Sequence, residues 1–109
     1  MHKLLELRAR PTTVMCSNDL TAIGALNAAH VRGLQIPREI SIVGFDDIQL
    51  SGVMQPPLTT IRIARAEIAS RAFMALYGTA SGARTRRVNH VVSAELITRS
   101  SMAPTPDKL

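Results

Sequence analysis

Two short polar clusters carry the side chains best suited to binding a small ligand. Ser17-Asn18-Asp19 follows one apolar stretch, and Asp46-Asp47 follows another. An amide both donates and accepts hydrogen bonds, and a carboxylate accepts two hydroxyl groups at once. Asn18 together with Asp46 therefore suits a polyhydroxylated ligand such as a sugar or a nucleoside. The alternatives are that Asn18 or Asp19 only caps a helix, and that Asp46 and Asp47 form a turn or a magnesium site.

The sequence offers little evidence for nucleophilic catalysis. His2, His30 and His90 show no spacing typical of a catalytic triad or a metal site. Cys16 lies in a predicted buried strand, where a thiol behaves as a small hydrophobic group. A glycine-rich phosphate-binding loop is also missing from the sequence. The sequence therefore predicts no enzymatic activity, no catalytic or metal-binding residue and no cofactor.

A predicted β-α-β unit over residues 12–44 positions both polar clusters. Its elements are a buried strand at 12–16, a helix at 20–32 and a second buried strand at 40–44. Charge-free, β-branched stretches are typical of strands in a parallel sheet. Adjacent parallel strands lie about 5 Å apart, and ligands bind at their carboxyl ends. We therefore expect Asn18 and Asp46 to reach the same ligand.

The rest of the chain adds weaker elements around this unit. We expect a helix end at 2–10, a loop at 45–57, a strand at 58–61, an amphipathic helix at 64–77, a loop at 79–87, a strand at 88–98 and a frayed tail at 100–109. Gly33 is expected to end the first main helix in a left-handed conformation, and Gly78 is expected to end the second. Arg84, Arg86 and Arg87 suggest nucleic-acid binding. A solvated loop is favoured, because neither a helix-turn-helix nor interleaved aromatic residues accompany them.

Composition narrows the class of protein. The chain has 109 residues, of which 46% are hydrophobic, so it can form one small domain with a core. Aromatic residues make up 3%, too few for an RNA-binding surface of stacked rings. A single cysteine excludes a disulfide framework. No apolar run reaches the length of a membrane span, and no signal peptide follows the start. We therefore expect a cytoplasmic protein with no membrane partner.

Four ordered motifs together resemble one known family. The motifs are Ser17-Asn18-Asp19 with Ala22-Ile23-Gly24-Ala25, then residues 33–48 (GLQIPREISIVGFDDI), then residues 56–62 (PPLTTIR), and then residues 95–101 (ELITRSS). In this order and spacing they resemble the C-terminal third of transcription regulators of the lactose-repressor/galactose-repressor (LacI/GalR) family. The resemblance covers nearly the whole chain, from about Pro11 to Ser101.

The resemblance implies an α/β fold of the type I periplasmic-binding-protein-like class, with a Rossmann-like parallel sheet and most of the N-terminal lobe missing. Residues to about 61 would then belong to the C-terminal lobe and residues 62–91 to the N-terminal lobe. Residues 92–101 would form the returning strand, and residues 102–109 the tail. The chain as a whole would be a partial effector-binding and dimerisation domain.

The resemblance also implies roles for individual residues. Asn18 and Asp46 would hydrogen-bond the effector, and Asp47 would support the loop. Ile23 and Met54 would pack in the interface of a homodimer, with ordinary core packing as the alternative. Operator DNA would be bound only through an N-terminal helix-turn-helix that this chain lacks. Ile63 stands where relatives often carry a polar residue, which puts one effector contact in doubt.

Two other interpretations stay open. One is a fragment of a periplasmic sugar-binding transport protein, since such proteins share this architecture. The other is a non-functional truncated remnant. The PPLTT motif at residues 56–60 and the Arg99-Ser100 ending favour the regulator.

Overall fold

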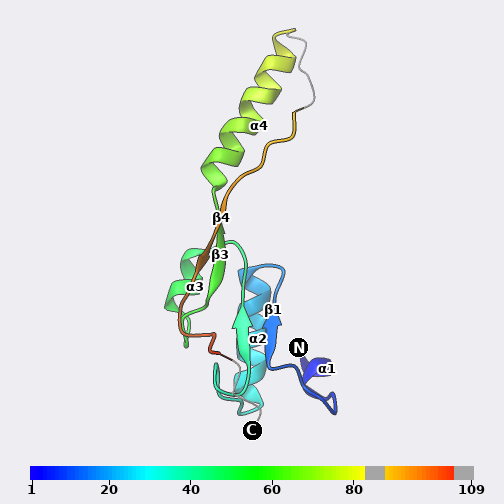
Figure 1. Ribbon diagram of the computed structural model, residues 1–109, viewed down its shortest axis with the longest axis vertical. Coiled ribbons are helices and arrows are strands. Elements are labelled where there is room, and N and C mark those ends of the chain that lie inside the picture. The colour runs from blue at the N-terminus through cyan, green and yellow to red at the C-terminus, as the bar shows by residue number, and fades with distance from the viewer. Residues whose placement is uncertain (83–87, 105–109) are drawn as a thin grey trace. The chain divides into compact units, whose positions relative to one another are not determined.

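The computed structural model of the protein describes residues 1–82 and 88–104 (Figure 1). The chain divides into two compact units. The first comprises Met1–Arg62 with the described residues from Leu96 onward, and the second lies between Ile63 and Glu95. The predicted lobe bounds, and the assignment of the units to two lobes, stay predictions. No helix in the described residues has the length and hydropathy needed to cross a membrane.

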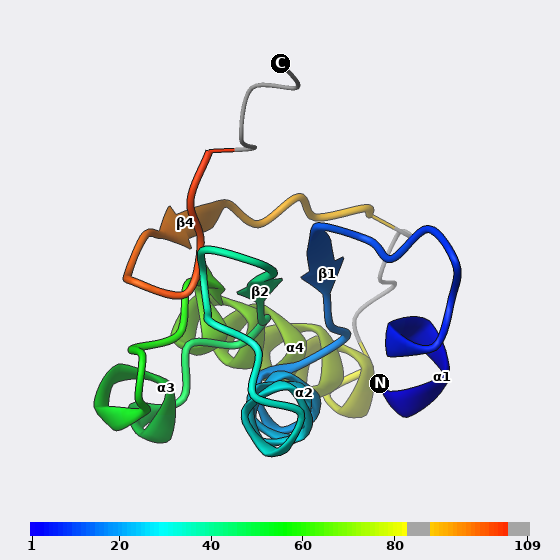
Figure 2. The same ribbon diagram turned by 90° about the horizontal axis from the view of Figure 1, so that it is seen from below.

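The first unit contains the predicted β-α-β arrangement. Its elements are α1 (His2–Leu5), β1 (Thr13–Met15), α2 (Asp19–Val31), β2 (Ser41–Val43) and α3 (Gln49–Val53). Strands β1 and β2 pair in parallel, with Val14 opposite Ile42. Helix α2 packs against this pair (Figure 2). The predicted α/β class is therefore confirmed.

The two paired strands differ in burial. All of β2 is buried, as the sequence predicted. The prediction of a buried β1 is wrong, since Thr13 is exposed and Met15 is 63% exposed. In the described residues β1 has β2 as its one strand partner and forms an edge of the sheet. An edge strand keeps polar backbone groups and side chains in contact with solvent.

Helix α2 supplies most of the core because its small residues allow close packing. Ala22 and Ala29 are fully buried, and Leu26 lies between them. They join a cluster with the following buried residues: Leu5, Cys16, Ala25, Ile40, Ile42 and Leu58. The helix ends as predicted at Gly33, whose φ is +71° and whose N–H donates to the carbonyl of His30 at 2.9 Å.

The segment after β2 contains a helix that the sequence did not predict. The expected loop at 45–57 includes α3, a single turn too short to show apolar periodicity. Ser51 holds it in place, since its hydroxyl donates to the carbonyl of Ile48 at 2.6 Å and its carbonyl accepts from the N–H of Leu58 at 2.8 Å. Beyond it, Thr59 runs beside the end of β2 through a parallel bridge to Val43.

Residues 100–104 are ordered, so the prediction of a frayed tail is wrong for them. Ser101 is fully buried. Its hydroxyl donates to the carbonyl of Ile42 at 2.6 Å and accepts from the N–H of Thr59 at 2.8 Å. These contacts join residues far apart in sequence, which local composition does not reveal. The end of the predicted tail, residues 105–109, lies outside the described residues.

The second unit carries the long helix α4 (Arg65–Ala80). The predicted stop at Gly78 is wrong, because the helix continues to Ala80 and the left-handed glycine is Gly82, with φ +79°. The predicted apolar face is exposed, and no residue of α4 is buried in the described part of the chain. Phe73 stacks on Tyr77 with the ring centroids 6.2 Å apart.

Strands β3 (Thr60–Ile63) and β4 (Ala94–Ile97) pair with each other at the boundary of the units. The predicted strand at 88–98 is therefore correct only over its last third. The basic residues Arg84, Arg86 and Arg87 lie outside the described residues, so the loop prediction for them stays a prediction.

Candidate functional site

The loops that follow β1 and β2 meet at one edge of the sheet. The N–H of Cys16 donates to the carbonyl of Val43, and the N–H of Asp19 donates to the carbonyl of Phe45, both at 2.8 Å. Asn18 and Asp46 each adjoin one member of the second pair in sequence. The sequence therefore correctly predicted that the two polar clusters share an edge. That these two residues bind a ligand stays a prediction.

Asn18 is the N-cap of α2. Its backbone is extended, and its side-chain oxygen accepts from the N–H of Thr21 at 2.8 Å. The capping interpretation is thus correct, and it uses only the oxygen of the amide. Among the described residues, the half-buried side chain donates no hydrogen bond through its NH₂ group. Capping and ligand binding are therefore compatible at this position.

Asp46 combines a strained backbone with a side chain that has no hydrogen-bond partner in the described part of the chain. Its φ of +112° is rare for a residue with a Cβ. Such strain costs about 1–3 kcal/mol and is concentrated at ligand-binding sites. The backbone is held by a hydrogen bond of 2.8 Å from the N–H of Asp46 to the carbonyl of Ile61. Among the described residues, the half-buried carboxylate accepts no hydrogen bond.

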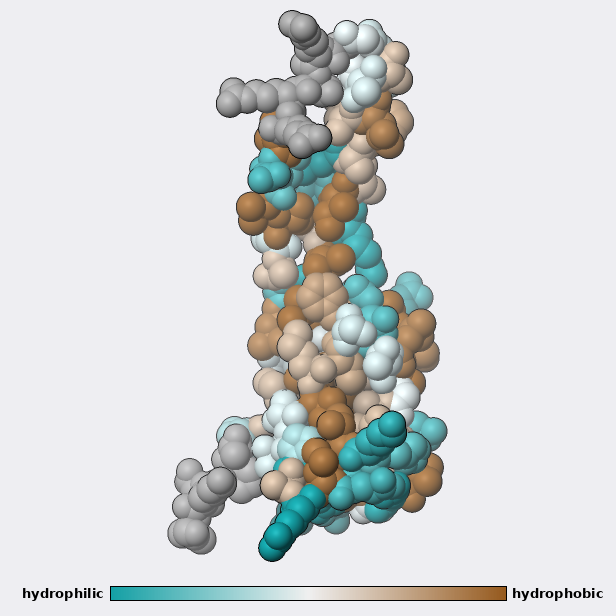
Figure 3. Space-filling model, turned by 90° about the vertical axis from the view of Figure 1, so that its right-hand side faces the viewer, coloured by the Kyte–Doolittle hydropathy of each residue, from teal (hydrophilic) through white to brown (hydrophobic). Residues whose placement is uncertain are grey.

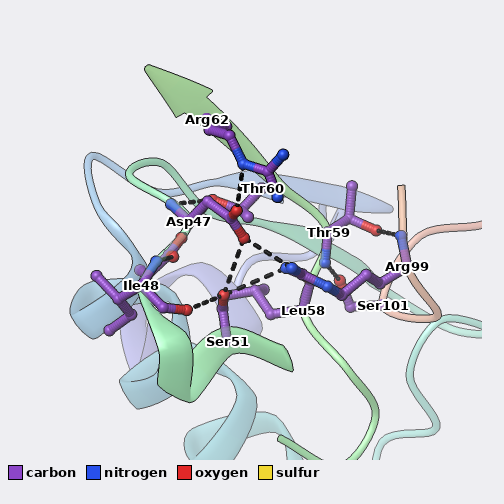
Figure 4. Close-up of polar contacts among 10 residues, drawn as sticks. Asp47, Ile48, Ser51, Leu58, Thr59, Thr60, Arg62, Arg99 and Ser101 are labelled. Atoms are coloured by element: carbon purple, nitrogen blue, oxygen red, sulfur yellow. Dashed lines mark hydrogen bonds and ion pairs between the residues drawn. The ribbon is translucent and has the colours of Figure 1, made fainter. Parts of the chain in front are cut away.

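Both carboxylate oxygens of Asp47 are bonded to protein side chains (Figure 4). Its carboxylate lies 2.7 Å from Arg62 Nε and 2.7 Å from a terminal nitrogen of Arg99, and its side chain is only 8% exposed. Burial on its own would raise the pKa of Asp47, but hydrogen bonds and charge from Arg99 and Arg62 outweigh it and lower the pKa. Asp47 therefore supports the loop, and with both oxygens on arginines it is a poor magnesium ligand.

Asp19 is the buried centre of the site, and the sequence interpretation missed this role. The residue is fully buried. One carboxylate oxygen accepts from the N–H of Ile48 at 2.9 Å, and the other accepts from the hydroxyl of Thr60. A Cβ on Gly44 would lie 2.2 Å from Asp19 Oδ1. The glycine that ends the second predicted strand was the available signal, because a missing side chain leaves room for a close neighbour.

Arg99 was likewise missed, because nothing local in the sequence points to its partners. Besides Asp47, its guanidinium donates to the carbonyl of Leu58 at 2.8 Å and to the hydroxyl of Ser51 at 3.2 Å. These residues come from α3 and the segment before β3, and Figure 4 shows them converging on the guanidinium. Arg99 therefore connects the segment that follows β4 to the loop that carries Asp46.

Ile23 and Met54, the two predicted interface residues, are half-buried and pack against the core cluster. The core-packing alternative thus describes the contacts that both make. Exposed apolar side chains adjoin them, with Leu20 67% and Val53 77% exposed. Figure 3 shows hydrophobic side chains at the surface among hydrophilic ones. The interface role of both residues stays a prediction.

A surface hollow in the first unit does not coincide with the candidate site. It lies at the C-terminal end of α2, where His30, Leu34 and Gln55 line it. Asn18, by contrast, lies at the N-terminal end of the same helix. The candidate site is therefore argued from the polar groups at the sheet edge and not from this hollow.

Comparison with known proteins gives a consistent set of matches. A family model described as a periplasmic binding protein-like domain matches residues 1–102. The transcriptional repressor CytR of Escherichia coli K12 is 40% identical over 106 residues, which are 97% of this chain and 31% of the repressor. The chain thus spans about a third of the length of this curated relative.

Solved structures agree with the sequence matches. A putative transcriptional regulator LacI from Bacillus cereus superposes with a TM-score of 0.91 at 27% identity, over 96% of this chain and 37% of that one. The lac repressor dimer, bound to operator and the anti-inducer ONPF, superposes with a TM-score of 0.77 at 30% identity. That match covers 86% of this chain and 32% of the repressor.

Proposed function

Since the chain belongs to the LacI/GalR family of transcription regulators, with a periplasmic-binding-protein-like fold, we propose that it is the effector-sensing and dimerising part of such a regulator. The resemblance stated from the sequence motifs is thereby confirmed at the level of the family. The relatives named above are transcriptional regulators and not enzymes, which favours the regulator over a transport protein and supports a cytoplasmic, non-enzymatic role.

The proposed effector is a sugar or a nucleoside. Asp46 is the main acceptor for its hydroxyl groups, and the free NH₂ group of Asn18 is a secondary donor. In the intact regulator the effector bridges two lobes and binds one closed arrangement more tightly than the other. This difference in affinity shifts the population of the two arrangements and, through it, the affinity of an N-terminal DNA-binding part for its operator. The lac repressor dimer bound to operator and the anti-inducer ONPF is consistent with this proposal.

One contrast among neighbouring acidic residues supports the site most directly. The carboxylates of Asp19 and Asp47 are both satisfied by protein donors. Among the described residues, only the carboxylate of Asp46 within this group of three lacks a donor, although its backbone is strained. A half-buried acceptor without a protein partner is costly unless a ligand or water satisfies it.

The test is calorimetry on the natural full-length protein with adenosine, uridine, ribose, glucose and cellobiose as probes. We expect Asp46→Ala to weaken the binding of the recognised probe by about 1.5–3 kcal/mol, the value for a lost charged hydrogen bond. Glu6→Ala is the matched control, because Glu6 is an exposed carboxylate paired with Arg32 on another part of the unit. Unchanged affinity in a folded Asp46→Ala variant would refute the assignment.

A second variant separates the two roles of Asn18. Asn18→Asp keeps an oxygen for the cap on Thr21 and removes the NH₂ donor. We expect binding to weaken while the free energy of unfolding changes by less than about 0.5 kcal/mol. Weakened binding that only follows a loss of stability would leave Asn18 as a cap alone.

A further inference from the structure

The strongest unexplained feature is a carboxylate held between two arginines from different segments. Arg62 belongs to β3, and Arg99 follows β4 by two residues. Both contact Asp47 at 2.7 Å, one on each carboxylate oxygen. Their side chains come from the two places where the chain leaves the first unit and returns to it, since the first unit runs to Arg62 and resumes at Leu96.

This pair of contacts is not an ordinary surface salt bridge. Exposed ion pairs contribute little because water screens them. The side chain of Asp47 is only 8% exposed, so its charge depends on these two partners for solvation. Arg99 is also the better anchored arginine, with 22% exposure against 51% for Arg62. Its other donors reach Leu58 and Ser51.

Arg62 and Arg99 on the carboxylate of Asp47, here called the clamp, act on the backbone of the neighbouring residue, Asp46. Asp47 has a φ of +49° and Asp46 a φ of +112°, so two consecutive residues hold left-handed or strained conformations. Strained conformations persist only where their surroundings fix them. The bond from the N–H of Asp46 to Ile61 is one such constraint. The two arginines on Asp47 are a second constraint, and the N–H of Asp47 also donates to the hydroxyl of Thr60 at 3.4 Å.

We propose that Arg99, with Arg62 in a lesser role, is a positioning residue that holds the carboxylate of Asp46 in its binding geometry through Asp47. For ligand affinity this inference rests on the proposed function. Because the arginines lie at the two crossings of the chain, a movement of either crossing segment alters the support of Asp46. The clamp therefore links effector affinity to the state of the crossing segments.

The test is amide hydrogen exchange measured by NMR on the natural full-length protein. We expect Arg99→Gln to speed exchange at the Asp46 amide about tenfold and Arg62→Gln to speed it about threefold, as local opening becomes easier. The amide of Leu26, inside α2, should exchange at the wild-type rate. Arg71→Gln is the matched control, since Arg71 forms an exposed pair with Glu67 on α4.

Two results would overturn the positioning role. One is an Asp46 amide that exchanges at the wild-type rate in Arg99→Gln. The other is a parallel increase at Asp46 and Leu26, which makes Arg99 a general stabiliser. Arg99→Lys serves as the second variant. It keeps the charge and should restore at least half of the lost protection, whereas no restoration would argue against a clamp by charge.

Affinity for the probes then distinguishes this inference from the proposed function. If Arg99→Gln speeds exchange at the Asp46 amide and weakens the binding of the recognised probe by a similar factor, the proposed function and the positioning role are both supported. If Asp46→Ala leaves affinity unchanged, the proposed ligand contact is wrong. The positioning of Asp46 by Arg99 is still decided by the exchange rates alone.

Discussion

Replacement of Gly44 by alanine should be among the most damaging small changes in the chain. An added Cβ would lie 2.2 Å from Asp19 Oδ1 and 3.0 Å from Leu58 Cδ2. Neither neighbour can move easily, because both residues are fully buried. The carboxylate would have to shift, and with it the hydrogen bonds from Ile48 and Thr60.

The magnitude follows from those bonds. A hydrogen bond to a charged group contributes about 1.5–3 kcal/mol, and a buried acceptor left without its donors costs a similar amount. Partial relaxation recovers some of this, so we expect Gly44→Ala to lower the free energy of unfolding by about 3–5 kcal/mol. This is a large share of the roughly 5–15 kcal/mol that stabilises a typical domain.

Urea denaturation of the purified chain measures the effect, and Gly24 provides the matched control. Gly24 lies within α2 and an added Cβ would meet no other atom within 4 Å, so Gly24→Ala should stabilise the protein by about 0.5–1 kcal/mol. The same substitution thus has opposite signs at two sites. In an Asp19→Ala background, the cost of Gly44→Ala should largely disappear, because the clash is removed. A Gly44→Ala variant as stable as the wild type, or an unchanged cost in that background, would refute the reasoning.

Two further predictions concern pH and assembly. The pKa of Asp47 is lowered in the folded protein, so its contribution to stability is present above the ordinary aspartate pKa of about 3.9 and is lost as pH falls below it. The difference in unfolding free energy between wild type and Asp47→Asn should therefore be constant from about pH 5 to 7 and shrink towards pH 2; a constant difference down to pH 2 would contradict the role of the arginines. Size-exclusion chromatography with light scattering should detect a dimer that Val53→Glu, a change beside Met54 at a 77% exposed position, converts to a monomer. If the wild-type chain is monomeric, the predicted interface role of Ile23 and Met54 is wrong.

The β-α-β unit could be predicted because its signals are local. Strand residues, the Asn18 cap and Gly33 at the helix end all lie within a few residues of the structure they determine. The shared edge of the two polar clusters follows from parallel pairing, so the sequence also located the candidate site.

The interior of the site could not be predicted, since its contacts join distant residues. Asp19 and Thr60 are 41 positions apart, and Arg99 and Asp47 are 52 apart. Side-chain type alone did not distinguish the three neighbouring aspartates. Their difference arises from which donors the fold brings to each carboxylate.

Helix α4 illustrates a different failure. Its apolar residues have helical spacing, which correctly predicted a helix. The apolar residues on it are exposed, with Phe73 64% and Leu76 71% exposed. Periodicity indicates that a face is apolar but does not say which surface covers it. The end of the helix depended on Gly82 and not on Gly78, a choice between two glycines that only the three-dimensional structure resolves.

The position of Ser101 has a consequence for synthesis of the protein. Its hydroxyl completes the bonding of Ile42, 59 residues earlier in the chain, and of Thr59. During synthesis on the ribosome, the last hydrogen bonds of β2 and of the segment beside it can therefore form only after almost the entire described chain has emerged. Until then the nascent first unit lacks the hydrogen bonds that Ser101 makes to Ile42 and Thr59.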